Sequence, residues 1–147
     1  MVASGWSHVV PYCADLNTAL RDLQEGLFRD EDYYWYDDDE RPTSLTELWR
    51  LLSQTDLGAI GTHSILDVDR VGDGDGDEKS DFGSIRPLTA AERQRWFGTD
   101  TPTRADYDNL HDDIEFHADP PRWSGRCVVL YRDGKPDAIA FWGSSGD

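Results

Sequence analysis

The segment that most constrains the fold lies near the C-terminal end of the chain. Residues 126–132 (RCVVLYR) and 137–142 (DAIAFW) are rich in β-branched and aromatic side chains, and DGKP separates them. Two such runs around a short polar segment predict an antiparallel hairpin with a four-residue turn. Both faces of the hairpin are apolar, so we expect it to be central and covered on both sides, or to line a cleft with one face.

The first half of the chain shows one strand pattern and two helix patterns. Residues 6–13 read as a short opening strand, and Pro11 favours an edge position or an early end. Asp15 is placed to cap a helix whose leucines recur at helical spacing to about residue 28. Ser44 and Glu47 have the spacing of a capping box before a second amphipathic helix.

The middle of the chain predicts a strand and two more helices. Residues 58–71 (GAIGTHSILDVDRV) have the β-branched content and alternation of a strand. A capping box of Thr89 and Glu92 predicts a short helix that stops at Gly98. Thr103 is expected to cap the last helix, with one face that carries Tyr107, Leu110, His111 and Ile114.

These elements predict a single acidic α+β domain over residues 1–147. We expect a small antiparallel or mixed sheet of about four strands, with three or four helices on it and a β-hairpin at its end. Residues 72–83 (GDGDGDEKSDFG) are expected to form a flexible Asp/Gly-rich loop, because glycine adds conformational freedom and repeated aspartate does not pack. Cys13 and Cys127 are expected to be reduced thiols rather than a disulfide.

The charge of the chain is large and uneven. The net charge is −16, and residues 1–85 hold 19 acids and 6 bases while residues 86–147 hold 11 acids and 8 bases. Direct nucleic-acid binding is disfavoured because like charges repel, and a basic partner is favoured. The alternative is general surface acidity, as in a salt-adapted protein. We find neither a membrane-spanning run nor a leader at residues 1–5, so we expect a cytoplasmic protein.

The stretch DEDYYWYDDDE, residues 30–40, is the main candidate site. In an extended segment Tyr33 and Trp35 point one way and Tyr34 and Tyr36 the other, so one pair can pack on the core while the other faces a partner. Aromatic rings among carboxylates suit a cation. The predicted binding residues are Asp30, Asp32, Tyr33, Tyr34, Trp35, Tyr36, Asp37, Asp38, Asp39 and Glu40.

The sequence therefore favours a non-enzymatic acidic binding protein that recognises a basic protein or a cationic small molecule. A bacterial inhibitor or immunity-type protein is one form of this hypothesis, and mimicry of DNA phosphates is another. Trp35 is expected to be a binding hot spot, so that Trp35→Ala weakens binding by about 2 kcal/mol or more. The alternative is a small enzyme whose cleft lies beside the hairpin, with His63 or His111 as base and a nearby aspartate to orient it.

Other patterns point to weaker candidates, and no cofactor or metal is predicted. Asp67, Asp69, Gly72 and Glu78 match positions of a calcium-binding loop, but Val71 occupies a ligand position, so an EF-hand is not predicted.

HDDIEFHAD, residues 111–119, holds zinc-ligand types at a spacing that matches no metal motif. A Cys127–His63 nucleophile pair lacks the flanking features that activate a thiolate. The arginines of 86–104 are expected to pair with the protein's own acidic half.

Overall fold

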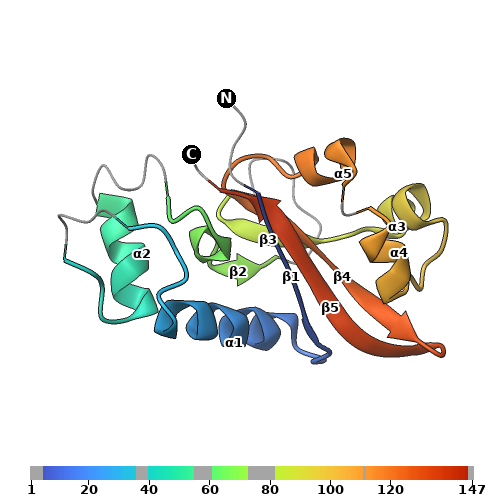
Figure 1. Ribbon diagram of the computed structural model, residues 1–147, viewed down its shortest axis with the longest axis horizontal. Coiled ribbons are helices and arrows are strands. Elements are labelled where there is room, and N and C mark those ends of the chain that lie inside the picture. The colour runs from blue at the N-terminus through green and yellow to red at the C-terminus, as the bar shows by residue number, and fades with distance from the viewer. Residues whose placement is uncertain (1–4, 36–39, 55–60, 73–81, 111, 146–147) are drawn as a thin grey trace.

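The computed structural model describes residues 5–35, 40–54, 61–72, 82–110 and 112–145. Within these ranges a mixed sheet has the strand order β1-β5-β4-β3-β2 (Figure 1). The strands are β1 (Gly5–Pro11), β2 (Arg70–Val71), β3 (Ser84–Pro87), β4 (Ser124–Arg132) and β5 (Lys135–Ser144). The helices are α1 (Leu16–Arg29), α2 (Leu45–Gln54), α3 (Ala90–Phe97), α4 (Arg104–Asp108), α5 (Ile114–Ala118) and the 3₁₀ helix η2 (Ile65–Asp67). The α+β class is confirmed, with five strands and five α-helices in the described residues instead of about four and three or four.

The C-terminal hairpin is present and forms the centre of the sheet. β5 pairs antiparallel with both β4 and β1, and β1 is an edge strand that ends at Pro11, as predicted. The predicted four-residue turn is wrong: Asp133 and Gly134, with φ of 52° and 77°, make a two-residue turn. Two successive left-handed residues match the twist of a tight hairpin, so Lys135 and Pro136 are already part of β5.

Both faces of the hairpin are covered, as its apolar composition predicts. Ile139 and Phe141 face a core that includes Leu20 of α1. The alternate residues Ala140 and Trp142 face a second core, to which Tyr107 of α4, Phe116 of α5 and side chains of α3 contribute. Figure 1 shows α1 apart from the group formed by α3, α4 and α5, so the sheet is the middle layer between two sets of helices.

Two glycines of the hairpin make room for a tryptophan of the edge strand. Gly125 and Gly143 are direct partners in the β4–β5 register, and Gly143 also pairs with Trp6 of β1. A Cβ at Gly125 would lie 2.6 Å from Cη2 of Trp6, and one at Gly143 would lie 2.7 Å from the same atom. The Trp6 indole therefore occupies the space that side chains at Gly125 and Gly143 would need, and only 7% of Trp6 is exposed.

The predicted strand over 58–71 is wrong in the part that the structure describes. Residues 61–64 form a turn, residues 65–67 form η2, and only Arg70 and Val71 are in a strand; residues 55–60 lie outside the described residues. The polar side chains hold this conformation. Ser64 accepts a hydrogen bond from the Leu66 amide, and Asp67 accepts one from the Thr62 amide, so the backbone is engaged locally instead of in a ladder.

The helix predicted after Thr103 is two short helices. The Thr103 cap is present, but α4 ends at Asp108 and α5 begins at Ile114, with Asp113 as its own cap. Competition from the aspartate explains the break, because the Asp113 carboxylate accepts the Phe116 amide and starts a new helix. His111 lies outside the described residues, as does 73–81 of the predicted loop.

The other predicted caps are present, with one difference. Asp15 caps α1, and Thr89 forms its capping box with Glu92 before a left-handed Gly98. Ser44 accepts from the Glu47 amide, but the Glu47 carboxylate accepts from the amide and hydroxyl of Thr43 instead of closing the box on Ser44. These hydrogen bonds lower the pKa of Glu47.

The Glu92 carboxylate also joins α3 to the sheet, and this gives a testable pH dependence. Both of its oxygens accept hydrogen bonds from Arg86 of β3, one of them at 2.9 Å. This pairing lowers the pKa of Glu92 to about 2. Since the folded-state pKa is below the unfolded value, the contribution to stability is complete above about pH 4.5 and is lost as the pH falls toward 2.

We expect Arg86→Gln to return the pKa of Glu92 toward 4.5, which a carboxyl-carbon NMR titration can follow. The exposed Arg104→Gln is the control, because Arg104 pairs with Asp108 and does not touch Glu92. A Glu92 titration unchanged by Arg86→Gln would show that the arginine is not the cause of the low pKa.

Candidate functional site

Two of the predicted site residues belong to the core. Trp35 is 5% exposed and packs with Leu45, Leu48 and Leu66, and its indole N–H donates to the Glu40 carbonyl at 3.3 Å. Tyr33 is partly buried in the same cluster and meets Trp35 edge to face at 6.3 Å between ring centroids. These two rings anchor the segment against α2, as the alternation of the sequence allows.

Tyr34 points the other way and is held in place. Its ring is stacked on the His63 imidazole with centroids 4.5 Å apart and planes 9° apart, yet the residue remains 40% exposed. Its backbone N–H donates to the Thr62 carbonyl at 2.8 Å. His63 itself has a left-handed backbone, with φ of 54°. A rigid aromatic side chain that is half open to solvent loses little conformational entropy when a partner covers it.

The described acids on either side of Tyr34 in the sequence lie at the surface. Asp30, Glu31, Asp32 and Glu40 are exposed, and none of them forms an ion pair within the part of the chain that the structure describes. Tyr36, Asp37, Asp38 and Asp39 lie outside the described residues. Arg41 is close by, but it lies over the ring of Tyr33, with 5.1 Å to the centroid.

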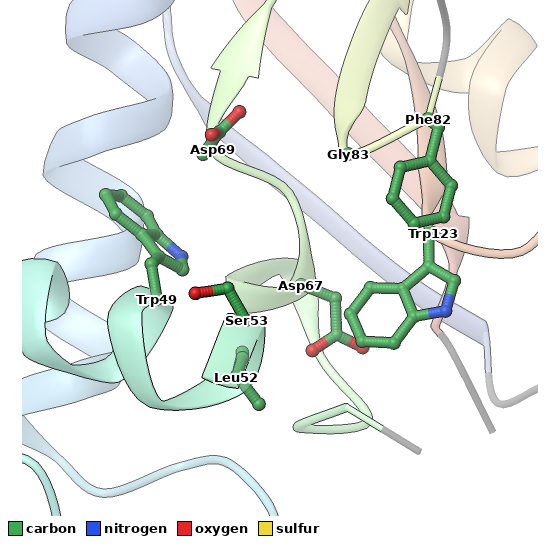
Figure 2. Close-up of a pocket in the computed structure, with 8 residues that line it drawn as sticks. All are labelled: Trp49, Leu52, Ser53, Asp67, Asp69, Phe82, Gly83 and Trp123. Atoms are coloured by element: carbon green, nitrogen blue, oxygen red, sulfur yellow. The ribbon is translucent and has the colours of Figure 1, made fainter. Parts of the chain in front are cut away.

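A pocket of about 290 Å³ lies between α2, the η2–β2 connection and the residues that lead into β3 and β4 (Figure 2). Its walls are largely apolar and come from Trp49, Leu52, Phe82 and Trp123. Polar groups are contributed by Ser53, Asp67 and Asp69. The pocket thus repeats the combination of aromatic rings and carboxylates that the sequence shows at residues 30–40.

The aromatic walls of the pocket are fixed by hydrogen bonds. The Trp49 indole N–H donates to the Leu66 carbonyl at 2.9 Å. Trp123 has a φ of 63°, an uncommon left-handed conformation for a bulky residue. Its carbonyl accepts from the Gly83 N–H at 2.6 Å and its N–H donates to the Ser144 carbonyl at 3.1 Å, so the backbone is clamped on both sides. Such conformations persist only where the surroundings enforce them.

The two carboxylates of the pocket differ in their environment. Asp67 is buried, and its Oδ1 accepts hydrogen bonds from the amide and the hydroxyl of Thr62 at 2.6 and 2.8 Å. Asp69 is about half exposed, and its Oδ1 meets the Arg70 guanidinium at 2.8 Å. Figure 2 shows Asp67 reaching toward Trp123, whereas Asp69 lies at the other end of the pocket.

One turn connects the pocket to the exposed tyrosine. Thr62 bonds Asp67 through its amide and hydroxyl, and its carbonyl accepts from the Tyr34 amide. The next residue, His63, stacks on the Tyr34 ring. The 62–63 turn therefore contacts both Tyr34 and Asp67, one of the residues that line the pocket.

Only part of the enzyme hypothesis falls within the described residues, because His111 lies outside them. A second pocket, of about 200 Å³, does lie beside the hairpin, along β4, but its described lining holds Arg93, Asp100 and Cys127 and no histidine. Burial raises the pKa of Cys127 to about 12, so this thiol is not an activated nucleophile. Both cysteines are free thiols.

The arginines of 86–104 have partners close in sequence. Arg86 pairs with Glu92, Arg93 approaches Asp100 at 3.9 Å, and Arg104 pairs with Asp108. These ion pairs differ from the predicted pairing with the acidic half of the chain. Helical spacing and short turns bring acid and base together locally.

Neither a metal cluster nor a membrane-spanning helix is found among the described residues. Within them, no three His, Cys, Asp or Glu side chains gather closely enough to hold a metal ion. The residues of the calcium-loop pattern from 73 onward, and His111, fall outside these ranges. The described helices include none that is long and apolar enough to cross a membrane.

Sequence reasoning missed the pocket residues Trp49, Phe82 and Trp123 as a group. Trp49 reads as an ordinary core residue of an amphipathic helix. Phe82 and Trp123 are isolated aromatic residues in turn-rich segments. That isolation is the one signal that could have identified them, since an aromatic residue in such a segment belongs to no helix or strand whose face it would help to bury.

The chain matches no protein-family model, and no curated protein sequence or solved structure is significantly similar to it.

Proposed function

We propose that this chain is a non-enzymatic binding protein that recognises a basic protein or cationic ligand, and that it acts in the cytoplasm as an inhibitor or immunity-type protein does. The contact residues in this proposal are those predicted within 30–40, and Tyr34 is the central one among those that the structure describes. A strongly anionic surface attracts a cationic partner over long range and repels nucleic-acid phosphates.

The observation that carries the proposal is that Tyr34 is exposed and yet held in a fixed position. An exposed ring is held by a backbone hydrogen bond and by stacking on His63, and the acids that flank it in the sequence are exposed and form no ion pair in the described residues. Tyrosine is enriched at interface hot spots, and the carboxylates select for Lys and Arg on the partner. This geometry supports recognition of a positively charged surface.

The test uses two exposed tyrosines as a matched pair. Tyr34 is 40% exposed and Tyr12, at the end of β1, is 42% exposed. We expect Tyr34→Ala to weaken binding by about 2 kcal/mol or more, roughly 30-fold in affinity, and Tyr12→Ala to leave it unchanged. The partner is captured from a lysate of the cells that make the protein, and its affinity is then measured by calorimetry with each variant.

Salt provides the second readout. The captured partner should be a basic protein that is retained at low salt and released at about 0.5 M salt, where screening acts within a few ångströms. Asp30→Asn with Asp32→Asn should reduce this salt dependence, while Asp137→Asn, an exposed acid of β5, should not. Equal affinities for Tyr34→Ala and wild type, or a partner list insensitive to salt, would refute the proposed surface.

A further inference from the structure

The pocket lined by Trp49, Phe82 and Trp123 has the size and the lining of a receptor for one side chain. Its volume of about 290 Å³ is at the lower end of the range for ligand pockets, which suits a group smaller than a typical cofactor. Rings of Trp49, Phe82 and Trp123 form apolar walls, the half-exposed carboxylate of Asp69 lies at one end, and the buried carboxylate of Asp67 lines the other. A long apolar stem with a cationic end matches both features.

The protein already uses the same chemistry internally. The Arg21 guanidinium lies over the Trp49 ring at 5.0 Å, Arg41 lies over Tyr33 at 5.1 Å, and Arg95 lies over Trp96 at 4.7 Å. Planar guanidinium groups stack on aromatic faces and pair with carboxylates in a way that a lysine ammonium does not. The pocket offers further aromatic surface and carboxylates of this kind, without an arginine among its described lining residues.

We propose that this pocket binds an alkylguanidinium group, in the form of an arginine side chain presented by the basic partner. The stem lies between Trp49 and the Phe82–Trp123 pair, whose ring centroids are 6.0 Å apart, and the guanidinium meets the carboxylate of Asp69. Asp69 is accessible because its ion pair with Arg70 is exposed to solvent. Exposed ion pairs contribute little free energy, so a guanidinium group in the pocket can replace Arg70 as the partner of Asp69. The choice of an arginine occupant rests on charge complementarity: residues 1–85 hold 19 acids and 6 bases.

The identification of the occupant as a partner side chain rests on the proposed function, but the binding of the guanidinium group is tested without any partner. The full chain is titrated with three small probes, the N-acetyl methylamides of arginine, citrulline and lysine. Citrulline has the shape of arginine without its charge, and lysine has the charge without the planar group. The indole N–H signals of Trp49 and Trp123 report binding by NMR.

We expect the arginine probe to shift the Trp123 signal saturably, with a dissociation constant of the order of 1–10 mM, and citrulline to bind about tenfold more weakly. Phe82→Ala and Asp69→Asn should each weaken the arginine probe by roughly fivefold or more. Phe82 is 62% exposed, so its truncation leaves the core intact, and Tyr12→Ala serves as the control. Citrulline binding equal to arginine, lysine binding equal to arginine, or an absence of saturable shifts would overturn the proposal.

The source of the guanidinium is decided by comparing two affinities. Free agmatine, a decarboxylated arginine, stands for a small-molecule ligand and the captured basic protein for a macromolecular one. Millimolar agmatine binding together with at least fivefold weaker partner binding by Phe82→Ala supports a partner side chain. Micromolar agmatine binding, or partner binding that Phe82→Ala leaves unchanged, would overturn it. If Tyr34→Ala left partner binding unchanged while the arginine probe still bound saturably, the proposed function would be refuted and the guanidinium site would remain supported.

Discussion

Gly143→Ala should lower the free energy of unfolding by about 3 kcal/mol, a large effect for a single methyl group. The added Cβ would come within 2.7 Å of Cη2 of Trp6 and would also meet the carbonyl oxygen of Ser124 on the neighbouring strand. Neither neighbour can move easily, because Trp6 is buried and Ser124 belongs to the β4–β5 ladder. Urea denaturation followed by tryptophan fluorescence measures the loss.

Gly26→Ala is the matched control, with the opposite sign. Gly26 lies inside α1, and nothing is within 4 Å of the position that its Cβ would take. The same substitution there should stabilise the protein by about 0.5–1 kcal/mol, because alanine is the better helix former. A Gly143→Ala variant as stable as wild type would mean that the Trp6 indole does not lie on this glycine pair.

The accurate sequence predictions depended on residues close together in the chain. The Asp15 and Thr89 caps follow from side chains that accept hydrogen bonds from nearby backbone amides. The left-handed Gly98 follows from the freedom of a glycine backbone, and the hairpin follows from two strand-forming runs that are neighbours in the sequence. Pro11 limits β1 for a similarly local reason, since proline has no N–H to donate. The double-sided burial of β4 and β5 also follows from composition alone.

The failures arose where local polar contacts or distant neighbours decide the structure. Residues 61–71 have the composition of a strand, but the Thr62–Asp67 and Ser64–Leu66 hydrogen bonds fold most of them into a turn and η2. The pairing of Gly125 with Gly143 depends on strand register, which no single segment encodes. The pocket joins Trp49, Phe82 and Trp123 from three separate parts of the chain, so no spacing rule could have predicted it.

Trp35→Ala should lower the free energy of unfolding by about 3–5 kcal/mol, the range for truncation of a large aromatic residue in a core. Trp35 is 5% exposed and contacts the leucines that α2 buries, so its removal leaves a cavity between the 30–35 segment and α2. The sequence suggested Trp35 as a binding hot spot. Because Trp35 is buried, a loss of binding in Trp35→Ala would result from destabilisation of the fold and not from the loss of a direct contact with the partner. Thermal and urea denaturation separate the two effects.

Two further variants help to separate the loss of stability from the loss of partner binding. Trp35→Phe keeps an aromatic ring in the core and loses the hydrogen bond to the Glu40 carbonyl, so it should cost only about 1 kcal/mol. Tyr34→Ala, at the exposed next residue, should change stability by less than about 1 kcal/mol while it weakens partner binding. Normal stability combined with lost binding in Trp35→Ala would instead place Trp35 at the partner surface. The expected pattern assigns anchoring to Trp35 and recognition to Tyr34, two adjacent residues that face opposite sides of one extended segment.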